Sequence, residues 1–216
     1  MKKLIIIGTG AHAAEIEQYI YDNNSICNEF EIIGFVSNSY ESYLKYNFRH
    51  PFLGEFIGKD YIDKNISLIV AFSNIKFRID TINYYKELGY SFLNFIHHTS
   101  KVFSSVKMGE GNIICPYCQL GPNVTLGSFN TFNNKASVGH DSVIGNNNIF
   151  CPNIGLSGNT IIGDANFFSL NVATIPNVSI GDNNVIAPNM VIEKSIKSNS
   201  TFFHRFKETV LFTTSN

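Results

Sequence analysis

The sequence predicts a small parallel α/β domain followed by a parallel β-helix built from six-residue repeats. Strands alternate with helices before residue 100, and after it an apolar residue recurs at every sixth position. Glycine and asparagine also gather at the corners between the short strands. Both residues accept the left-handed backbone conformation that sharp corners need, which supports the repeat.

The first domain is expected over residues 1–98. Short apolar runs bounded by glycine or polar residues predict strands, and longer helical periodicity predicts helices. The strands are expected at 3–8, 31–36, 67–72 and 91–96, and the helices at 14–21 and 75–88. Strands that alternate with helices form a parallel sheet, so this domain is expected to be a small Rossmann-like fold.

A glycine-rich turn, Gly8-Thr-Gly-Ala-His-Ala13, joins the first strand to the first helix. Free backbone N–H groups in such a turn can hold a phosphate group. The acidic residue that would hold an adenosine ribose is missing, because Ser37-Asn38 closes the second strand. The turn therefore favours a pocket for a nucleotide or nucleotide-linked sugar over an NAD site, with a turn that binds nothing as the alternative.

The β-helix is expected over residues 99–197, with a C-terminal tail over 198–216. From Val102 to Ile192, fifteen of the sixteen residues spaced by six are apolar, and the sixteenth is Thr174. A period of six is typical of the hexapeptide β-helix, in which three hexads make one triangular coil of 18 residues. We expect about five coils, stacked about 4.8 Å apart.

Composition argues against several partners. The net charge is −1 and basic residues do not cluster, which argues against nucleic acid and anionic membranes. The apolar run at the start is too short for a signal peptide or a membrane span, so we expect no membrane insertion. Four cysteines without a disulfide pattern indicate a cytoplasmic chain. Cys115 and Cys118 form a CxxC without a second pair, so a structural role is favoured over a zinc site.

One corner of the repeat carries His140 and Asp141 side by side. When the sequence is written in rows of 18 residues, one row for each coil, equivalent positions fall in columns. Asp141 falls in a column of asparagines, where turn chemistry alone could explain it. His140 does not fit its own column of Ser, Pro, Gly and Lys. It is the only histidine in the repeats, and zinc needs three or four ligands, so no metal is expected. A histidine beside a carboxylate suits general-base catalysis, and a purely structural corner remains the alternative.

The chain resembles the family of sialic acid O-acetyltransferases and bacillosamine-type sugar N-acetyltransferases. The resemblance rests on IIIGTGAHA, HPFLGEF, NFIHHTS, FNNKASVGHDSVIG and LSGNTIIGD. It implies a left-handed β-helix, a homotrimer and acetyl-CoA as the acyl donor. The family's corner histidine is the general base and the following acid raises its basicity, so these roles are expected for His140 and Asp141.

The same resemblance implies further contacts. Gly158 lies 18 residues after His140, hence one coil above it, and its N–H would stabilise the oxyanion that forms on the thioester. Asn133 would line the acceptor site. The acyl donor would contact Gly158, Ser157, Leu170, Ala187 and Pro188. The nucleotide-linked sugar would contact Gly8, Gly10, Ala11, His12, Ser37, Asn38, Ser73, Asn74 and Arg78.

The sequence departs from the family pattern in three places. Ser37-Asn38 replaces an acidic pair, Ile149 replaces a histidine that reaches the cofactor, and the ending GxPAK is absent. These departures leave open which nucleotide binds and how the far end of CoA is held.

The leading prediction is an acetyl-CoA-dependent N-acetyltransferase that acts on the amino group of a nucleotide-linked deoxysugar. The product would enter surface glycan synthesis, such as the O-antigen of lipopolysaccharide. Direct transfer without a covalent enzyme intermediate is expected, because no cysteine lies beside His140 in the stack. The alternatives are a sugar O-acetyltransferase and a non-catalytic trimeric scaffold or ligand-binding protein.

Overall fold

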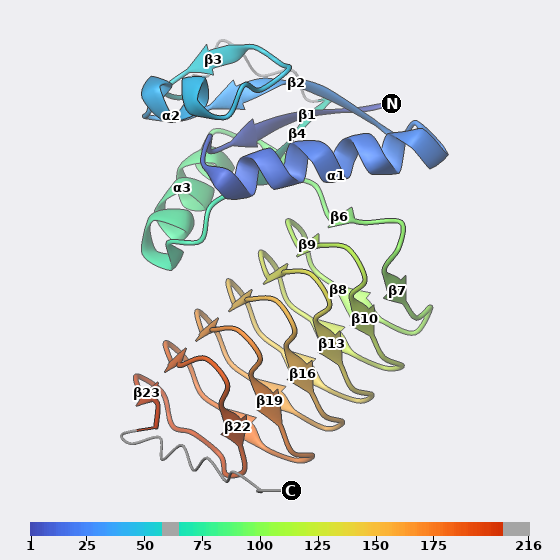
Figure 1. Cartoon of the computed structure of the whole chain (residues 1–216), viewed down its shortest axis with the longest axis vertical. Coiled ribbons are helices and arrows are strands. Elements are labelled where there is room, and N and C mark those ends of the chain that lie inside the picture. Colours follow the sequence, from blue (N-terminus) through green and yellow to red (C-terminus); the bar gives the residue numbers. More distant parts are fainter. Residues whose placement is uncertain (58–64, 205–216) are drawn as a thin grey trace, which may run out of the picture.

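A computed structural model describes residues 1–57 and 65–204. An α/β part lies at the N-terminal end of a stack of triangular coils (Figure 1). The expected C-terminal tail over 198–216 lies outside the described residues from 205 onward. The α/β part consists of β1 (Lys2–Ile7), α1 (Ala11–Cys27), β2 (Phe30–Val36), α2 (Tyr40–Lys45), β3 (Phe52–Gly54), β4 (Ile66–Val70), α3 (Ile75–Glu87) and β5 (Ser91–Phe92).

The α/β sheet is parallel, with strand order β3-β2-β1-β4-β5. The chain runs outward in one direction from β1 to β3 and in the other from β4 to β5. The order therefore reverses between β1 and β4, and in open parallel sheets ligands bind at the carboxyl ends of the strands beside such a reversal. The apolar part of β1, Leu4–Ile7, is buried, which fixes this central strand in the core.

Two predicted elements differ from the structure. The expected strand at 91–96 is two strands: β5 closes the α/β sheet, while β6 (Phe95–Ile96) pairs with a strand of the coil stack. Apolar periodicity does not reveal a change of pairing partner, because that partner lies elsewhere in the sequence. Helix α1 is also longer than the predicted 14–21, and it ends only where Asn28 adopts a left-handed conformation.

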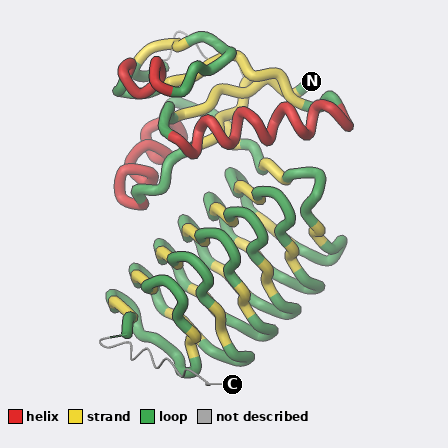
Figure 2. The backbone as a smooth tube through the Cα atoms, viewed as in Figure 1, coloured by secondary structure: helices red, strands yellow, loops and turns green. Residues whose placement is uncertain are grey.

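The coils are built from two-residue strands separated by tight corners (Figure 2). After β6 these are β7 (Lys101–Val102), β8 (Lys107–Met108), β9 (Ile113–Ile114), β10 (Gln119–Leu120), β11 (Thr125–Leu126), β12 (Thr131–Phe132), β13 (Ser137–Val138), β14 (Val143–Ile144), β15 (Ile149–Phe150), β16 (Gly155–Leu156), β17 (Ile161–Ile162), β18 (Phe167–Phe168), β19 (Ala173–Thr174), β20 (Ser179–Ile180), β21 (Val185–Ile186), β22 (Val191–Ile192) and β23 (Thr201–Phe202).

These strands form three parallel sheets, which we call the three faces. The first face is β7-β10-β13-β16-β19-β22, the second is β8-β11-β14-β17-β20, and the third is β6-β9-β12-β15-β18-β21-β23. Paired residues are 18 apart from β6 to β22, as in the Phe132–Phe150 pair, so one coil equals three hexads. The last coil is shorter, because β21 and β23 pair residues 16 apart. The predicted six-residue period is confirmed.

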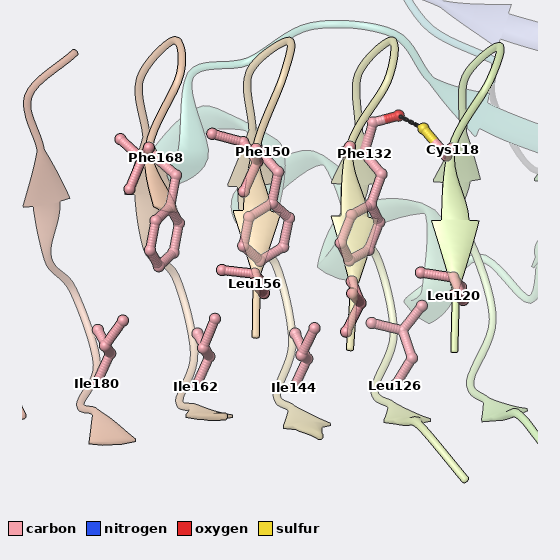
Figure 3. Packing of buried hydrophobic residues seen from close by; sticks show 14 of the residues in the cluster. Cys118, Leu120, Leu126, Phe132, Ile144, Phe150, Leu156, Ile162, Phe168 and Ile180 are labelled. Carbon is pink, nitrogen blue, oxygen red and sulfur yellow. Dashed lines mark hydrogen bonds between the residues drawn. The ribbon is translucent and has the colours of Figure 1, made fainter. Parts of the chain in front are cut away.

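The repeat positions explain both the core and the corners. The second residue of each strand points inward, and Phe132, Phe150 and Phe168 stack with ring centroids 4.4 and 4.8 Å apart (Figure 3). From Tyr117 to Asn189 every sixth residue has a positive φ of 55–64°. Asparagine fills most of these corner positions because it tolerates the left-handed conformation better than other non-glycine residues do.

Candidate active site

The corner that follows β13, between the first and second faces, carries His140 and Asp141. The two side chains are 60% and 47% exposed in the single chain, and His140 Nδ1 lies 2.7 Å from Asp141 Oδ2. This contact occupies one nitrogen of the imidazole ring and fixes the ring's orientation. The other nitrogen, Nε2, is left to act as an acceptor for a proton.

Asp141 is also held by a residue of the preceding coil. It adopts the corner conformation, with φ of 57°, and Asn123 in the preceding coil donates from Nδ2 to Asp141 Oδ1 over 2.9 Å. The hydrogen bond from Asn123, followed by the contact with His140, lowers the pKa of Asp141. The carboxylate is therefore ionised near neutral pH. The 18-residue period predicted that Asn123 shares this column, but not that it bonds the carboxylate.

Gly158 lies directly beside the imidazole ring. A Cβ at this glycine would be 2.7 Å from His140 Nε2 and 2.8 Å from Cε1, so any side chain would collide with the ring. Gly139 matters in the same way, since a Cβ there would collide with the nitrogen of Gly158. These two glycines let the coil bring a backbone amide next to the imidazole.

The N–H of Gly158 is free within the part of the chain that the structure describes, because it has no hydrogen-bond acceptor there. The reason is general to this corner: Pro122 and Pro176 occupy the same column, so the ladder between coils does not use that position's N–H. A proton acceptor and a residue with an unused N–H donor thus lie side by side. That pair can take a proton from a nucleophile and stabilise a developing oxyanion.

Four other predicted residues lie at a different corner. Asn133, Leu170, Ala187 and Pro188 follow strands of the third face, so they lie between the third and first faces. Within one chain they lie across the first face from His140. They can join His140 in one site only where this corner of one copy approaches the His140 corner of another.

Ser157 has its polar groups bonded within the coil stack. Its Oγ donates to the carbonyl oxygen of Thr174 over 2.6 Å, and its N–H donates to Thr174 Oγ1 over 2.9 Å. These bonds leave the hydroxyl hydrogen unavailable to a cofactor.

A pocket of about 740 Å³ opens in the α/β part where the strand order reverses. Of the predicted sugar-nucleotide contacts, Gly8, Gly10, Ser37, Asn38 and Asn74 line it. Gly8 follows β1 with φ of 116°, and a Cβ there would approach the carbonyl oxygen of Ala71 to 3.0 Å. Only glycine suits this turn. Ala11, His12 and Ser73 are not among the lining residues; His12 Nδ1 instead lies 3.3 Å from Glu15 Oε2.

The prediction that Arg78 contacts the substrate is wrong. Its side chain is fully buried and donates to the carbonyl oxygens of Val70 (2.8 Å), Phe72 (3.3 Å) and Phe129 (2.9 Å). Burial lowers the pKa of Arg78 to about 10. Because Phe129 belongs to the coil stack, Arg78 ties α3 to the coils. Asn74 is partly committed too, since its Oδ1 accepts the N–H of Phe77 and caps α3.

The aromatic lining of the pocket was not predicted from the sequence. Phe56, Phe77 and Tyr84 line it and expose 64%, 49% and 42% of their surface. Phe77 and Tyr84 lie seven residues apart, hence on one face of α3, and that spacing was the available signal. None of the described lining residues is a lysine or arginine. A flat ring could stack on this surface, while phosphate oxygens would depend on backbone N–H groups of the glycine turn.

The cysteines do not form a site in the described residues. Burial raises the pKa of Cys118 to about 11, and its Sγ donates to the carbonyl oxygen of Asn133 over 3.1 Å. No group of three or more His, Cys, Asp or Glu side chains in residues 1–57 and 65–204 is arranged to hold a metal ion. None of the helices described is both long and apolar enough to cross a membrane.

Known proteins match this chain in two ways. Residues 3–85 match the family model of the PglD N-terminal domain. The acetyltransferase domain of PglB from Neisseria gonorrhoeae FA1090, solved with acetyl coenzyme A, superposes with a TM-score of 0.81 at 21% identity. That match covers 93% of this chain and 95% of that one. A comparison with curated proteins finds no significant match.

Two further solved structures share the fold of this chain. PerB from Caulobacter crescentus, solved with CoA and GDP-perosamine, gives a TM-score of 0.82 at 22% identity and covers 92% of both chains. WeeI from Acinetobacter baumannii AYE gives 0.78 at 20% identity, covering 92% of this chain and 94% of that one. The predicted fold, an α/β domain followed by a left-handed β-helix, is confirmed by this agreement.

Proposed function

We infer that this chain is an acetyl-CoA-dependent sugar N-acetyltransferase. Its residues 3–85 match the PglD N-terminal domain, and it shares the fold of PglB's acetyltransferase domain and of PerB. The observation that carries the proposal is that Gly158, whose N–H has no acceptor among the described residues, lies directly beside the His140 ring. A base and an unused N–H donor at one corner are what acyl transfer to an amine requires.

The reaction follows from this geometry. The amino nitrogen of the acceptor attacks the carbonyl carbon of the thioester, and His140 Nε2 takes the proton that the nitrogen loses. The carbonyl oxygen becomes an oxyanion next to the N–H of Gly158, and Asp141 supports the imidazolium through Nδ1. The carbon–sulfur bond then breaks, and the proton on His140 passes to the departing thiolate. No covalent enzyme intermediate is needed.

The acceptor in this proposal is a nucleotide-linked amino-deoxysugar. The pocket at the strand reversal offers a glycine turn for the phosphates and exposed rings for the base. PerB was solved in complex with GDP-perosamine, a sugar on a nucleotide, which supports the same class of acceptor here. The product would be a building block of surface glycans such as lipopolysaccharide, made in the cytoplasm, a setting that suits the free cysteines.

We also infer a homotrimer. The residues expected to contact the acyl donor lie at two different corners, and only neighbouring copies can bring those corners together. Val143 and Ile161 on the second face expose 46% and 52% of their surface, which suits burial against another subunit. Sedimentation equilibrium tests the state, and a monomer at micromolar concentration would contradict it.

The activity is tested by release of free CoA thiol from acetyl-CoA in the presence of GDP-, UDP- and dTDP-linked 4-amino-4,6-dideoxysugars. We expect turnover with at least one of them, and His140→Ala should lower kcat by about 100-fold or more. His204→Ala, which removes an exposed histidine outside the corner, should behave like wild type. Silence with every amino sugar, or an unaffected His140→Ala variant, would overturn the proposal or its base respectively.

A further inference from the structure

Three hydroxyl side chains interrupt columns that are otherwise apolar, and all three surround Ser157. Thr174 is the one polar residue among the sixteen hexad positions. Ser142 and Thr160 share a column that otherwise holds valine. All three are buried, with Ser142 and Thr160 at 0% exposure and Thr174 at 4%. The apolar members of that second column are Val106, Val124 and Val178.

Buried hydroxyls bond both backbone polar groups of Ser157. Thr174 Oγ1 accepts its N–H over 2.9 Å, while Thr160 Oγ1 donates to its carbonyl oxygen over 2.7 Å. Ser142 Oγ donates to the same carbonyl over 3.3 Å, and the two threonine oxygens lie 3.1 Å apart. Both backbone polar groups of Ser157 are thus held by buried side chains.

The normal ladder is broken at this residue. At the equivalent position one coil earlier, Gly139 N donates to the carbonyl oxygen of Leu156 over 2.7 Å. Ser157 N should bond the carbonyl oxygen of Thr174 in the same way, but it bonds the hydroxyl instead. Correspondingly, β16 and β19 pair at one residue only, whereas the other neighbours on the first face pair at two. The break lies immediately before Gly158.

Stability does not require these hydroxyls. A buried hydroxyl costs free energy unless it is hydrogen-bonded, and an apolar residue at 174 would keep the core and let Ser157 N form the ladder bond to the carbonyl oxygen of residue 174. Local departures from the folding pattern are expected mainly at functional sites. We propose that Ser142, Thr160 and Thr174 are positioning residues that set the N–H of Gly158 beside His140. The proposal rests on the proposed function, because it assigns this N–H to the oxyanion.

The test is Thr174→Val, which keeps the shape of the side chain and removes only the hydroxyl. We expect kcat to fall about tenfold to 100-fold, since an oxyanion donor out of place loses most of its effect. The KM for the sugar and the pH dependence of kcat/KM should not change, because the His140–Asp141 contact is untouched. The melting temperature should stay the same or rise, and Thr174→Ser should restore kcat.

Thr131→Val is the matched control. Thr131 is also buried, at 4% exposure, and its Oγ1 has no partner among the described residues. The same chemical change there should leave kcat unaltered. Equal losses of kcat in both valine variants would overturn the proposal.

A crystal structure of Thr174→Val separates this proposal from the proposed function. It should show Ser157 N bonded to the carbonyl oxygen of residue 174 and the nitrogen of Gly158 displaced from the His140 ring. An undisplaced Gly158 would refute the positioning role, whatever the activity. Absence of turnover in the wild-type protein would instead refute the proposed function, and the displacement would still decide what the hydroxyls hold.

Discussion

Replacing Gly158 by alanine places a methyl group where the imidazole of His140 now lies. The new Cβ would be 2.7 Å from Nε2, 2.8 Å from Cε1 and 3.1 Å from Cδ2. Contacts between such atoms are comfortable at about 3.5 Å or more, so the ring must retreat by about 1 Å. The side chain of His140 is 60% exposed, which gives the ring room to move into solvent.

The structure therefore separates the effect on catalysis from the effect on folding. A misplacement of about 1 Å costs about 100-fold in rate, equivalent to about 2.7 kcal/mol in the activation free energy. The free energy of unfolding should change by only about 0.5 kcal/mol, because an exposed ring yields at little cost. We expect a folded protein with a large loss of kcat/KM.

The assay is CoA release by wild type, Gly158→Ala and Gly155→Ala, with melting temperatures from calorimetry. Gly155 lies in the same coil, but a Cβ there would meet only the Cβ of Ala173, at 4.0 Å. This control should keep wild-type kcat/KM. Wild-type activity in Gly158→Ala, or an equal loss in Gly155→Ala, would refute the reasoning.

Three other outcomes are expected. Asn123→Ala should raise the pKa of Asp141 in a carbon-13 NMR titration, so that the carboxylate protonates at a higher pH as pH falls; an unchanged pKa would assign no role to the hydrogen bond. Arg78→Ala should lower the free energy of unfolding in urea by about 3 kcal/mol or more, without weakening nucleotide binding by the folded protein. Weaker nucleotide binding at an unchanged free energy of unfolding would instead show that Arg78 contacts the nucleotide. A thiol reagent at pH 8 should label exposed Cys27 before Cys118, whose pKa of about 11 keeps it protonated; the reverse order would be incompatible with its burial.

The coil stack was predictable because each coil repeats the same local sequence pattern. An inward apolar residue and a left-handed corner recur every six residues, so the pattern needs no knowledge of distant contacts. The division of 91–96 into β5 and β6 was not predictable on that basis. Both halves are equally apolar, and only their pairing with β4 and β9 distinguishes them.

The same difference, between features set by the local repeat and features set by distant contacts, applies to the candidate site. A period of 18 residues places Gly158 above His140 and Asn123 below Asp141, and the structure has both pairs in contact. Arg78 escaped prediction because its burial depends on Phe129, which is 51 residues away in the chain. Thr174 was visible in the sequence as the exception to the hexad pattern, but its purpose depends on the bond to Ser157.

The prolines that share a column with His140 and Gly158 have a wider consequence. Pro122 and Pro176 show that the stack holds together without any N–H from this edge. The N–H groups along this edge are therefore not needed for folding, whereas the carbonyl oxygens of Pro122, His140 and Gly158 accept the N–H groups of Asp141, Asn159 and Asn177. Successive coils can thus carry side chains of different chemistry at this edge while the backbone hydrogen bonds between coils stay the same. The chemistry of one corner is thus separable from the scaffold that carries it.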